Sequence, residues 1–389
     1  MIKRVEVNYR GIFQKTLAKK IGSDIVLIAS RMGQVGFSNG RYSDSPERNG
    51  IPCKYFAFVS PDLSEEELEA ECGAKLDIDE ADVSVVLDDT MVKGVEPWGW
   101  HGVRPINEKV VEGGYLLVVS RRSHEDLLKF IGKKPYPYHL AILEGDASLA
   151  GLWVYKDDLT HERVLGAIAA LDPNIIAIEA VEQYLLDKTH EEQRAIAARQ
   201  AYESVKQRVK TVMPSEGIDW PYEIPVLPKW YEFEEGAVVR AVPRGFQMGP
   251  RGQSRNEMFK RGTTKSQRPV VRFDLCTKCT LCWLECPDQC FDPTPDGYFD
   301  VNYEYCTGCS KCAMVCPIKE CIVMVDELRF EDYRSPWEFW KRDPEGYVAW
   351  AEERKGLDRV SYPEVTGTGV LVTQGERVPV GKKIPVRKK

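Results

Sequence analysis

Short apolar runs recur through the first half of the chain, and polar or amphipathic stretches separate them. The runs that are long enough for strands cover residues 5–7, 25–29, 55–59, 84–87, 115–119, 139–143 and 175–178. Nearly continuous apolar strands alternating with amphipathic segments are typical of a parallel sheet covered by helices. We therefore predict an α/β domain over residues 1–213, with a mainly parallel, helix-covered sheet.

One amphipathic helix is predicted to close this domain. Thr189 followed by Glu192 matches a capping box, in which the two side chains satisfy backbone N–H groups. Pro214 should end the helix, because proline cannot continue its hydrogen bonds. The predicted apolar stripe, at three- and four-residue steps, consists of Ala198, Tyr202, Val205, Val209 and Val212. This pattern favours packing on the helix's own domain over a coiled coil with a partner.

Residues 214–270 show no clear period and contain seven of the 24 prolines of the chain. A structureless stretch of this length is unusual inside a compact domain. We therefore predict a linker over residues 214–270, which is draped over other surfaces and clasps a partner. Its arginines and lysines lack the interleaved aromatic rings that stack on bases, and the net charge of the chain is −7. We expect no nucleic-acid partner.

A thirty-residue internal repeat of cysteines follows this linker. Each repeat has three cysteines at three-residue steps and a fourth cysteine that precedes a proline. Three closely spaced thiolates can bind three irons of one iron–sulfur cube, while the fourth cysteine reaches the other cube. We predict a small α+β ferredoxin domain over residues 271–326 with two [4Fe–4S] clusters. The predicted ligands are Cys276, Cys279, Cys282 and Cys316 for cluster 1, and Cys306, Cys309, Cys312 and Cys286 for cluster 2.

Zinc and disulfide bonds are the alternatives for these cysteines. Zinc sites usually pair cysteines two by two, a spacing that these three-plus-one runs fit poorly. Disulfides need an oxidising compartment, and the N-terminus lacks the apolar core of a signal peptide. Without a membrane span as well, the pattern favours a reducing cytoplasm. Cys290 and Cys321 are predicted to be packing residues that hydrogen-bond a cluster sulfur, not ligands.

The last part of the chain, residues 327–389, is long for an extension of a ferredoxin. It starts with large aromatic residues and ends in a basic run. Because aromatic side chains dominate protein interfaces, we predict that this extension contacts another subunit. The aromatic residues are Trp337, Phe339, Trp340, Tyr347 and Trp350.

A polar, turn-rich stretch over residues 40–50 precedes the run at 55–59. Arg41 and Arg48 in this stretch could pair with a phosphate or carboxylate, because a guanidinium presents its donors in a matching fork. Ligands of open α/β sheets bind at the carboxyl ends of the strands. A solvated connector explains the same residues, so both interpretations stay open.

The order of these parts resembles a fused gamma–delta subunit of the 2-oxoacid:ferredoxin oxidoreductase family. Ser-Pro-Glu-Arg-Asn-Gly-Ile-Pro at residues 45–52 is similar to the family's Gly-Pro-Glu-Arg-Arg-Gly-Ala-Pro stretch. Residues 82–88 and 165–170 resemble further gamma segments, and the two cysteine repeats resemble the delta subunit. One departure is the turn at residues 10–15, where most of the family's glycines are missing.

The resemblance implies an electron-transfer subunit of an enzyme that oxidatively decarboxylates a 2-oxoacid. Thiamine diphosphate and Mg²⁺ would bind to separate alpha and beta subunits, and ferredoxin or a similar protein would accept the electrons. It implies no catalytic residue on this chain, and it places Glu47 and Arg48 near the acyl-acceptor side of the active site. Coenzyme A as a substrate stays open. The alternatives are a stand-alone redox adaptor, with an unrelated partner-binding α/β domain, and an independent enzyme with a site in that domain.

Overall fold

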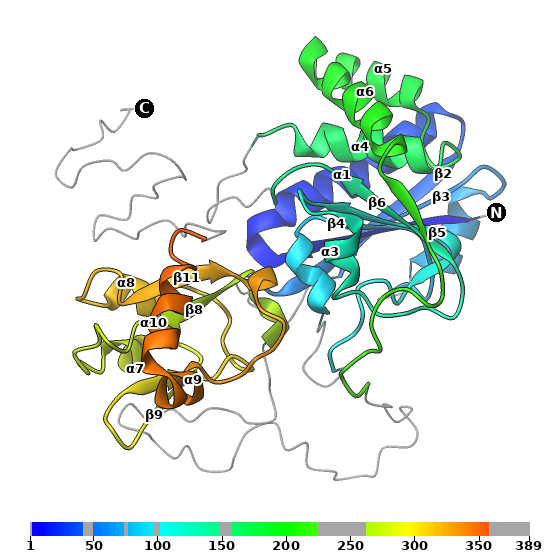
Figure 1. Ribbon diagram of the computed structural model, residues 1–389. Coiled ribbons are helices and arrows are strands. Elements are labelled where there is room, and N and C mark those ends of the chain that lie inside the picture. Colours follow the sequence, from blue (N-terminus) through cyan, green and yellow to red (C-terminus); the bar gives the residue numbers. More distant parts are fainter. Residues whose placement is uncertain are drawn as a thin grey trace, which may run out of the picture.

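The computed structural model describes residues 2–41, 50–73, 77–95, 102–147, 157–224 and 262–357 of the 389 residues. An α/β domain and a smaller cysteine-rich domain lie side by side (Figure 1). Glu47 and Arg48 lie outside the described residues. Among the described helices, none is long and apolar enough to cross a membrane.

A seven-stranded sheet forms the centre of the α/β domain, in the order β2-β3-β1-β4-β5-β6-β7. The four central strands β1, β4, β5 and β6 are parallel, whereas β2, β3 and β7 add antiparallel edges. The predicted α/β fold is thus confirmed, with a parallel centre and antiparallel margins. The strands are β1 (Lys3–Arg10), β2 (Val35–Arg41), β3 (Pro52–Ser60), β4 (Ala81–Val86), β5 (Val110–Val119), β6 (Tyr138–Leu143) and β7 (Val209–Val212).

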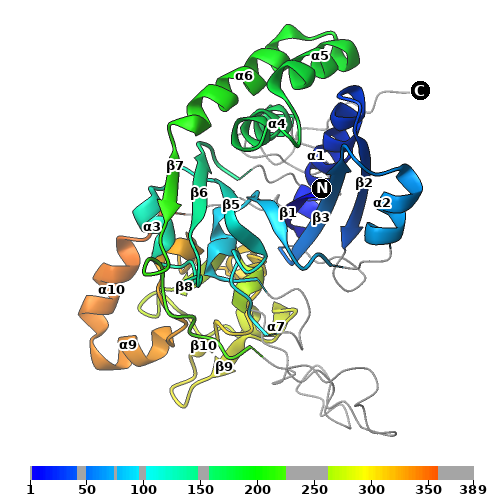
Figure 2. The same ribbon diagram turned by 90° about the vertical axis from the view of Figure 1, so that its right-hand side faces the viewer.

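Helices cover both faces of this sheet (Figure 2). Alternating strand residues separate the two faces: Val5 and Val7 pack on the larger helical layer, while Phe56 and Phe58 pack on the opposite side. The larger layer consists of α1 (Gly11–Arg31), α4 (Thr160–Leu171), α5 (Ile178–Thr189) and α6 (Glu192–Lys206). The opposite side carries α2 (Glu65–Cys72), the 3₁₀ turn η1 (Asp89–Lys93) and α3 (His124–Leu128).

Two of the predicted strands are wrong. Residues 25–29 lie inside α1, and residues 175–178 form a turn that leads into α5. In α1 the buried residues Ile21, Ile25 and Ile28 recur at three- and four-residue steps and face the sheet. A short apolar run on a helix cannot be told from a buried strand by its periodicity alone.

The predicted closing helix is also shorter than expected. Thr189 ends α5 instead of capping the next helix, and its hydroxyl donates to Leu185 O at 2.7 Å. Helix α6 ends at Lys206, and Val209 and Val212 belong to the edge strand β7, which pairs with β6. Val209 and Val212 are three residues apart and therefore point to opposite faces of the sheet, where they join different cores. The same spacing on a helix would place them on one face, so the sequence resembled a continued helical stripe.

Gly166 allows α4 and α6 to approach closely, because a Cβ atom at this position would overlap the carbonyl oxygen of Ala198. We expect Gly166→Ala to lower the free energy of unfolding by about 1–3 kcal/mol, the usual cost of overpacking. Chemical denaturation of the full chain measures this loss. Ala170→Ser, at a half-buried position of the same helix, should change the stability by less than about 0.5 kcal/mol. Equal stabilities of the glycine variant and the wild type would contradict this role.

The cysteine-rich domain is built from two short antiparallel strand pairs and two one-turn helices. β8 pairs with β11, and β9 pairs with β10. Strand β8 lies largely within the stretch predicted as linker. The elements are η2 (Gly262–Thr264), β8 (Gln267–Val271), α7 (Leu281–Glu285), β9 (Phe291–Pro293), β10 (Phe299–Val301), α8 (Lys311–Val315), β11 (Ile322–Asp326) and η3 (Glu327–Arg329).

Two helices of the predicted extension, α9 (Pro336–Arg342) and α10 (Pro344–Glu352), pack on this domain. The ring of Phe273 lies 5.3 Å from that of Trp337 and 5.5 Å from that of Tyr347. The Tyr347 hydroxyl donates to Val271 O at 2.7 Å. Trp337 and Tyr347 are therefore part of the chain's own core. A subunit contact stays a prediction for the rest of residues 327–389.

Buried charges connect the two domains at what we call the domain joint, formed by Lys93, Arg268 and Glu327. Lys93 Nζ of the α/β domain lies 2.8 Å from Glu327 Oε1, and Arg268 Nε donates to Glu327 Oε2 at 2.8 Å. All three side chains are buried. At the edge of the joint, Arg122 pairs with Asp326 at 2.9 Å. The joint places β8 and β11 beside η1 of the larger domain.

Candidate iron–sulfur centre

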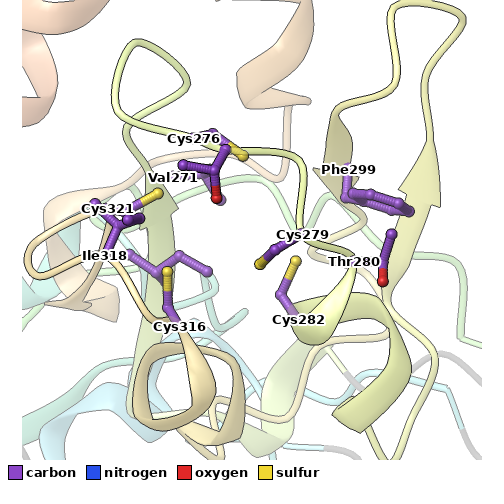
Figure 3. A pocket seen from close by; sticks show the side chains of 11 residues that line it. Val271, Cys276, Cys279, Thr280, Cys282, Phe299, Cys316, Ile318 and Cys321 are labelled. Atoms are coloured by element: carbon purple, nitrogen blue, oxygen red, sulfur yellow. The ribbon is translucent and has the colours of Figure 1, made fainter.

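Five cysteines surround a single cavity in the first half of the small domain (Figure 3). Three of them come from the loop after β8 and from α7, and two come from the end of the second repeat. Lys278 and Thr280 adopt left-handed backbone conformations, with φ of 59° and 68°. These turns curl the loop around the cavity. The cysteines are Cys276, Cys279, Cys282, Cys316 and Cys321.

The second cavity has the same construction. Gly308 and Ser310 repeat the left-handed turns, with φ of 69° and 65°. Its cysteines are Cys286, Cys290, Cys306, Cys309 and Cys312. The fourth cysteine of each repeat thus lies in the cavity of the other repeat, as the crossed ligand assignment expects. The ligand roles themselves remain proposals.

Backbone N–H groups point at sulfur atoms in both cavities. Lys278 N donates to Cys276 Sγ at 3.4 Å, and Gly308 N donates to Cys306 Sγ at the same distance. Such hydrogen bonds stabilise negative charge on a thiolate. All cysteines are free of disulfide bonds. A donor set dominated by thiols, with amide support, fits the iron–sulfur clusters that Cys ligands hold. Among the described residues, no three His, Cys, Asp or Glu are arranged to hold a single metal ion.

The fifth cysteine of each cavity acts on a predicted ligand. A hydrogen bond from Cys321 lowers the pKa of Cys276 to about 6, and one from Cys290 lowers the pKa of Cys286 to about 7. Burial instead raises the pKa of Cys282 and of Cys309 to about 12. Each cavity therefore combines a thiol that ionises readily with buried thiols that need a bound metal to ionise.

Removing the Cys321 thiol should change the electrochemistry without removing iron. We expect Cys321→Ala to lower the midpoint potential of one cluster, because a lost hydrogen bond to a ligand sulfur disfavours the added electron. A net hydrogen bond corresponds to about 20–60 mV for one electron. Redox titration followed by electron paramagnetic resonance measures the shift, and iron should stay at about eight atoms per chain. Cys72→Ala, which removes a buried thiol of α2, should leave both potentials unchanged; an equal shift there would contradict the assignment.

Arg10 was not singled out from the sequence, yet it anchors the start of the small domain. It ends β1 and is fully buried. Its guanidinium donates to Thr263 O at 2.7 Å, to Lys265 O at 3.3 Å and to Thr90 Oγ1 at 2.8 Å. We call residues 262–266 the strap. The strap is thereby held at the carboxyl end of β1, the end of a parallel strand where open α/β sheets usually bind ligands.

Lys265 of the strap reaches the second cavity. Its ammonium group donates to Tyr303 O at 2.6 Å and to Cys306 O at 3.5 Å. Lys265 and Arg268 belong to the stretch predicted as a linker draped over other surfaces, and both are buried. Arg41, considered for phosphate binding, forms an ion pair with Asp77 of its own domain. The one signal in the sequence for the buried residues Lys265 and Arg268 is the high density of basic residues before Cys276.

Comparison with known proteins supports the iron–sulfur assignment. Residues 270–324 match the family of 4Fe-4S dicluster domains. A segment of 41 residues is 49% identical to the delta subunit of NADH-dependent phenylglyoxylate dehydrogenase from Aromatoleum evansii, covering 10% of this chain and 43% of that subunit. A segment of 43 residues is 42% identical to the ketoisovalerate oxidoreductase subunit VorD from Pyrococcus furiosus, covering 11% and 41%. The chain thus spans less than half the length of these curated relatives. The small domain is a ferredoxin-type iron–sulfur domain.

A comparison with solved structures also found a similar chain. It is the subunit PORC of pyruvate oxidoreductase from Thermotoga maritima, at 18% identity and a TM-score of 0.36, covering 54% of this chain and 98% of that subunit.

Proposed function

We propose that this chain is the electron-transfer subunit of a multi-subunit 2-oxoacid oxidoreductase that uses thiamine diphosphate. Residues 1–213 would form a gamma-like part and residues 271–326 a delta-like part of one polypeptide. The observation that carries the proposal is the pair of cavities that each gather five cysteines, with exchanged fourth cysteines, in a domain joined to an α/β domain. The names of the relatives, which are subunits of oxidoreductases acting on oxoacids, support the same class of reaction.

The chain's own residues would hold and tune the clusters. Cys276, Cys279, Cys282 and Cys316 would ligate cluster 1, and Cys306, Cys309, Cys312 and Cys286 would ligate cluster 2. Bound there, two [4Fe–4S] clusters supply one-electron chemistry. The buried loop around Cys306, covered by the strap, excludes water and thereby fixes the environment on which a potential depends.

Thiamine diphosphate and Mg²⁺ belong in this proposal to alpha and beta partner subunits. The strap lies against Arg10 at the carboxyl end of β1, the end of a parallel sheet at which α/β domains usually bind ligands. Glu47 and Arg48 are proposed to lie near the acyl-acceptor side of the partner subunits' active site. An external ferredoxin or a similar carrier would receive the electrons.

Purification of the tagged chain from its host tests the proposal. Stoichiometric partner chains that contain thiamine diphosphate, with oxidation of a 2-oxoacid by the complex, are the expected result. Coenzyme A dependence can be measured in the same assay, together with Arg48→Ala for its effect on the acyl acceptor. A chain that elutes without thiamine-binding partners would favour a redox adaptor, and a lone monomer that oxidises a substrate would refute the subunit role.

A further inference from the structure

Lys265 of the strap carries a buried amine beside the second cavity. The residue is 1% exposed. Its Nζ donates to Gly262 O and Tyr303 O, each at 2.6 Å, and more weakly to Cys306 O at 3.5 Å. The centre of the Tyr333 ring lies 4.5 Å from the same nitrogen. Backbone dipoles and an aromatic face surround this group, and within the described part of the chain no carboxylate accepts a hydrogen bond from it.

The carboxylate of the domain joint is already shared between two other cations. Glu327 accepts hydrogen bonds from Lys93 and Arg268, so that, with Lys265, three buried basic side chains gather around one buried acid. Burial, assisted by the charge of Arg268 and opposed by that of Glu327, lowers the pKa of Lys265 to about 7. A buried charge without enough opposite charge nearby is costly. The neighbouring side chains thus balance the positive charge of Lys265 only in part.

A cluster in the second cavity would complete this balance. Cys306, whose backbone Lys265 contacts, is a predicted ligand of cluster 2. A [4Fe–4S] cluster with four thiolate ligands is negatively charged, and its reduction adds one electron and thus one more negative charge. A positive charge nearby favours the more negative form, and burial strengthens this attraction because little water screens it. Lys265 should therefore favour the reduced form of cluster 2 and raise its potential.

The charged groups at the two cavities differ. None of the described residues that line the first cavity is charged. Lys278 is close in sequence to Cys276 but exposed, and water and salt screen an exposed charge. Asp288 and Lys311 line the second cavity, yet Asp288 is half-buried and Lys311 is exposed. A cation that is almost completely buried, Lys265, is thus found at the second cavity.

We propose that Lys265 sets the reduction potential of cluster 2, because it holds a buried positive charge against the loop that carries Cys306. The inference rests on the ligand assignment of the proposed function and adds a residue from outside the cysteine repeat that tunes one of the two clusters. Lys265 is not among the described residues that line the second cavity, so it acts through space and does not ligate iron. The guanidinium of Arg10 donates to Lys265 O at 3.3 Å, so the larger domain fixes the position of this charge.

The charge can be removed and restored at this position in the full chain. Lys265→Gln removes the charge and keeps an amide that can donate to the carbonyl oxygens, whereas Lys265→Arg keeps the charge. Redox titration followed by electron paramagnetic resonance measures both clusters, and the signal that Cys306→Ala abolishes identifies cluster 2. At pH 6, below the lowered pKa of Lys265, the ammonium group is charged even without a cluster. Lys278→Gln, which removes an exposed charge from the first cysteine loop, is the matched control.

At a fixed potential, we expect Lys265→Gln to lower the ratio of reduced to oxidised cluster 2 about tenfold, which corresponds to a midpoint potential about 59 mV lower. Cluster 1 should shift much less. Lys265→Arg should stay close to the wild type, and Lys278→Gln should leave cluster 2 unchanged. Loss of cluster 2 iron from Lys265→Gln, with full iron content in Lys265→Arg, would also support the proposal, because the cluster then requires the charge.

Four results would overturn the proposal: an unchanged ratio in Lys265→Gln, equal shifts of both clusters, an equal change or iron loss in Lys265→Arg, or an equal shift of cluster 2 in Lys278→Gln. The measurement involves no 2-oxoacid and no partner subunit. A wild-type chain without clusters would refute the proposed function and this inference with it. Intact clusters with an unchanged ratio would refute only the role of Lys265.

Discussion

Cys286→Ala is expected to disrupt cluster 2, although Cys286 belongs to the first cysteine repeat. The structure places Cys286 in the cavity that Cys306, Cys309 and Cys312 line. A [4Fe–4S] cluster that loses one of its four thiolate ligands is lost or converted to another type. Complete loss would lower the iron content from about eight to about four atoms per chain. Iron analysis and electron paramagnetic resonance of the reduced protein measure the change.

Matched variants identify the affected cluster. Cys306→Ala and Cys276→Ala each remove a ligand that belongs to its own repeat's cavity, so their assignment does not depend on the exchange of the fourth cysteines. The spectrum of Cys286→Ala should therefore resemble that of Cys306→Ala, and the spectrum of Cys316→Ala should resemble that of Cys276→Ala. The opposite pairing would refute the crossed connectivity. About one or two zinc atoms per chain in the wild type, without iron, would refute the cluster assignment as a whole.

Glu327→Gln is expected to give the largest loss of stability. Glu327 is 2% exposed and is the carboxylate between the buried Lys93 and Arg268. Without its charge, two buried cations face each other, and breaking a buried pair in this way costs about 3–5 kcal/mol. Urea unfolding of the full chain measures the loss. Glu331→Gln, at an exposed position of the same segment, should change the stability by less than about 0.5 kcal/mol.

The same carboxylate predicts a dependence on pH. Although burial by itself would raise it, the charges of Arg268, Lys265 and Lys93 lower the pKa of Glu327 to about 2. A lowered folded-state pKa means that the contribution of Glu327 is complete above its ordinary pKa of 4.5 and is lost as the pH falls toward 2. The difference in stability between wild type and Glu327→Gln should shrink over this range. A difference that stays constant between pH 6 and pH 3 would contradict the ion-pair explanation.

Patterns with local causes could be predicted from the sequence. The cysteine spacing correctly predicted which thiols line each cavity: three come from one repeat, and the fourth comes from the other repeat. Five strand predictions succeeded because their alternation or apolar content matched a sheet. The prediction of a strand at residues 25–29 failed because the outward residue Leu27 of α1 is apolar as well, although it is 50% exposed, so the run lacks the polar positions that mark an amphipathic helix. The prediction that Val209 and Val212 belong to the helix failed because a strand of only four residues can continue the spacing of a helical stripe.

Contacts between distant segments were beyond prediction. Arg10 and Thr263 are 253 positions apart, and Lys93 and Glu327 are 234 positions apart. A charged residue looks the same in the sequence whether it is solvated or paired in a core. Arg268 therefore appeared to belong to an extended basic linker, although the ring of Phe330 and the carboxylate of Glu327 enclose it. Whether such a residue is buried depends on the distant residue that pairs with it, which the local sequence does not reveal.

The buried domain joint has a consequence for assembly. Two domains held together only by a tether could each pair with a domain from another copy of the chain. Here Glu327 needs Lys93, and the backbone of the strap needs Arg10, so separated domains would expose several unmatched charges and donors. Each α/β domain is therefore held to one cysteine-rich domain by these contacts. The one-to-one ratio of the two domains does not depend on the residues that connect them. Fusion into one polypeptide then mainly ensures that both halves are made together, in equal amounts and at the same place.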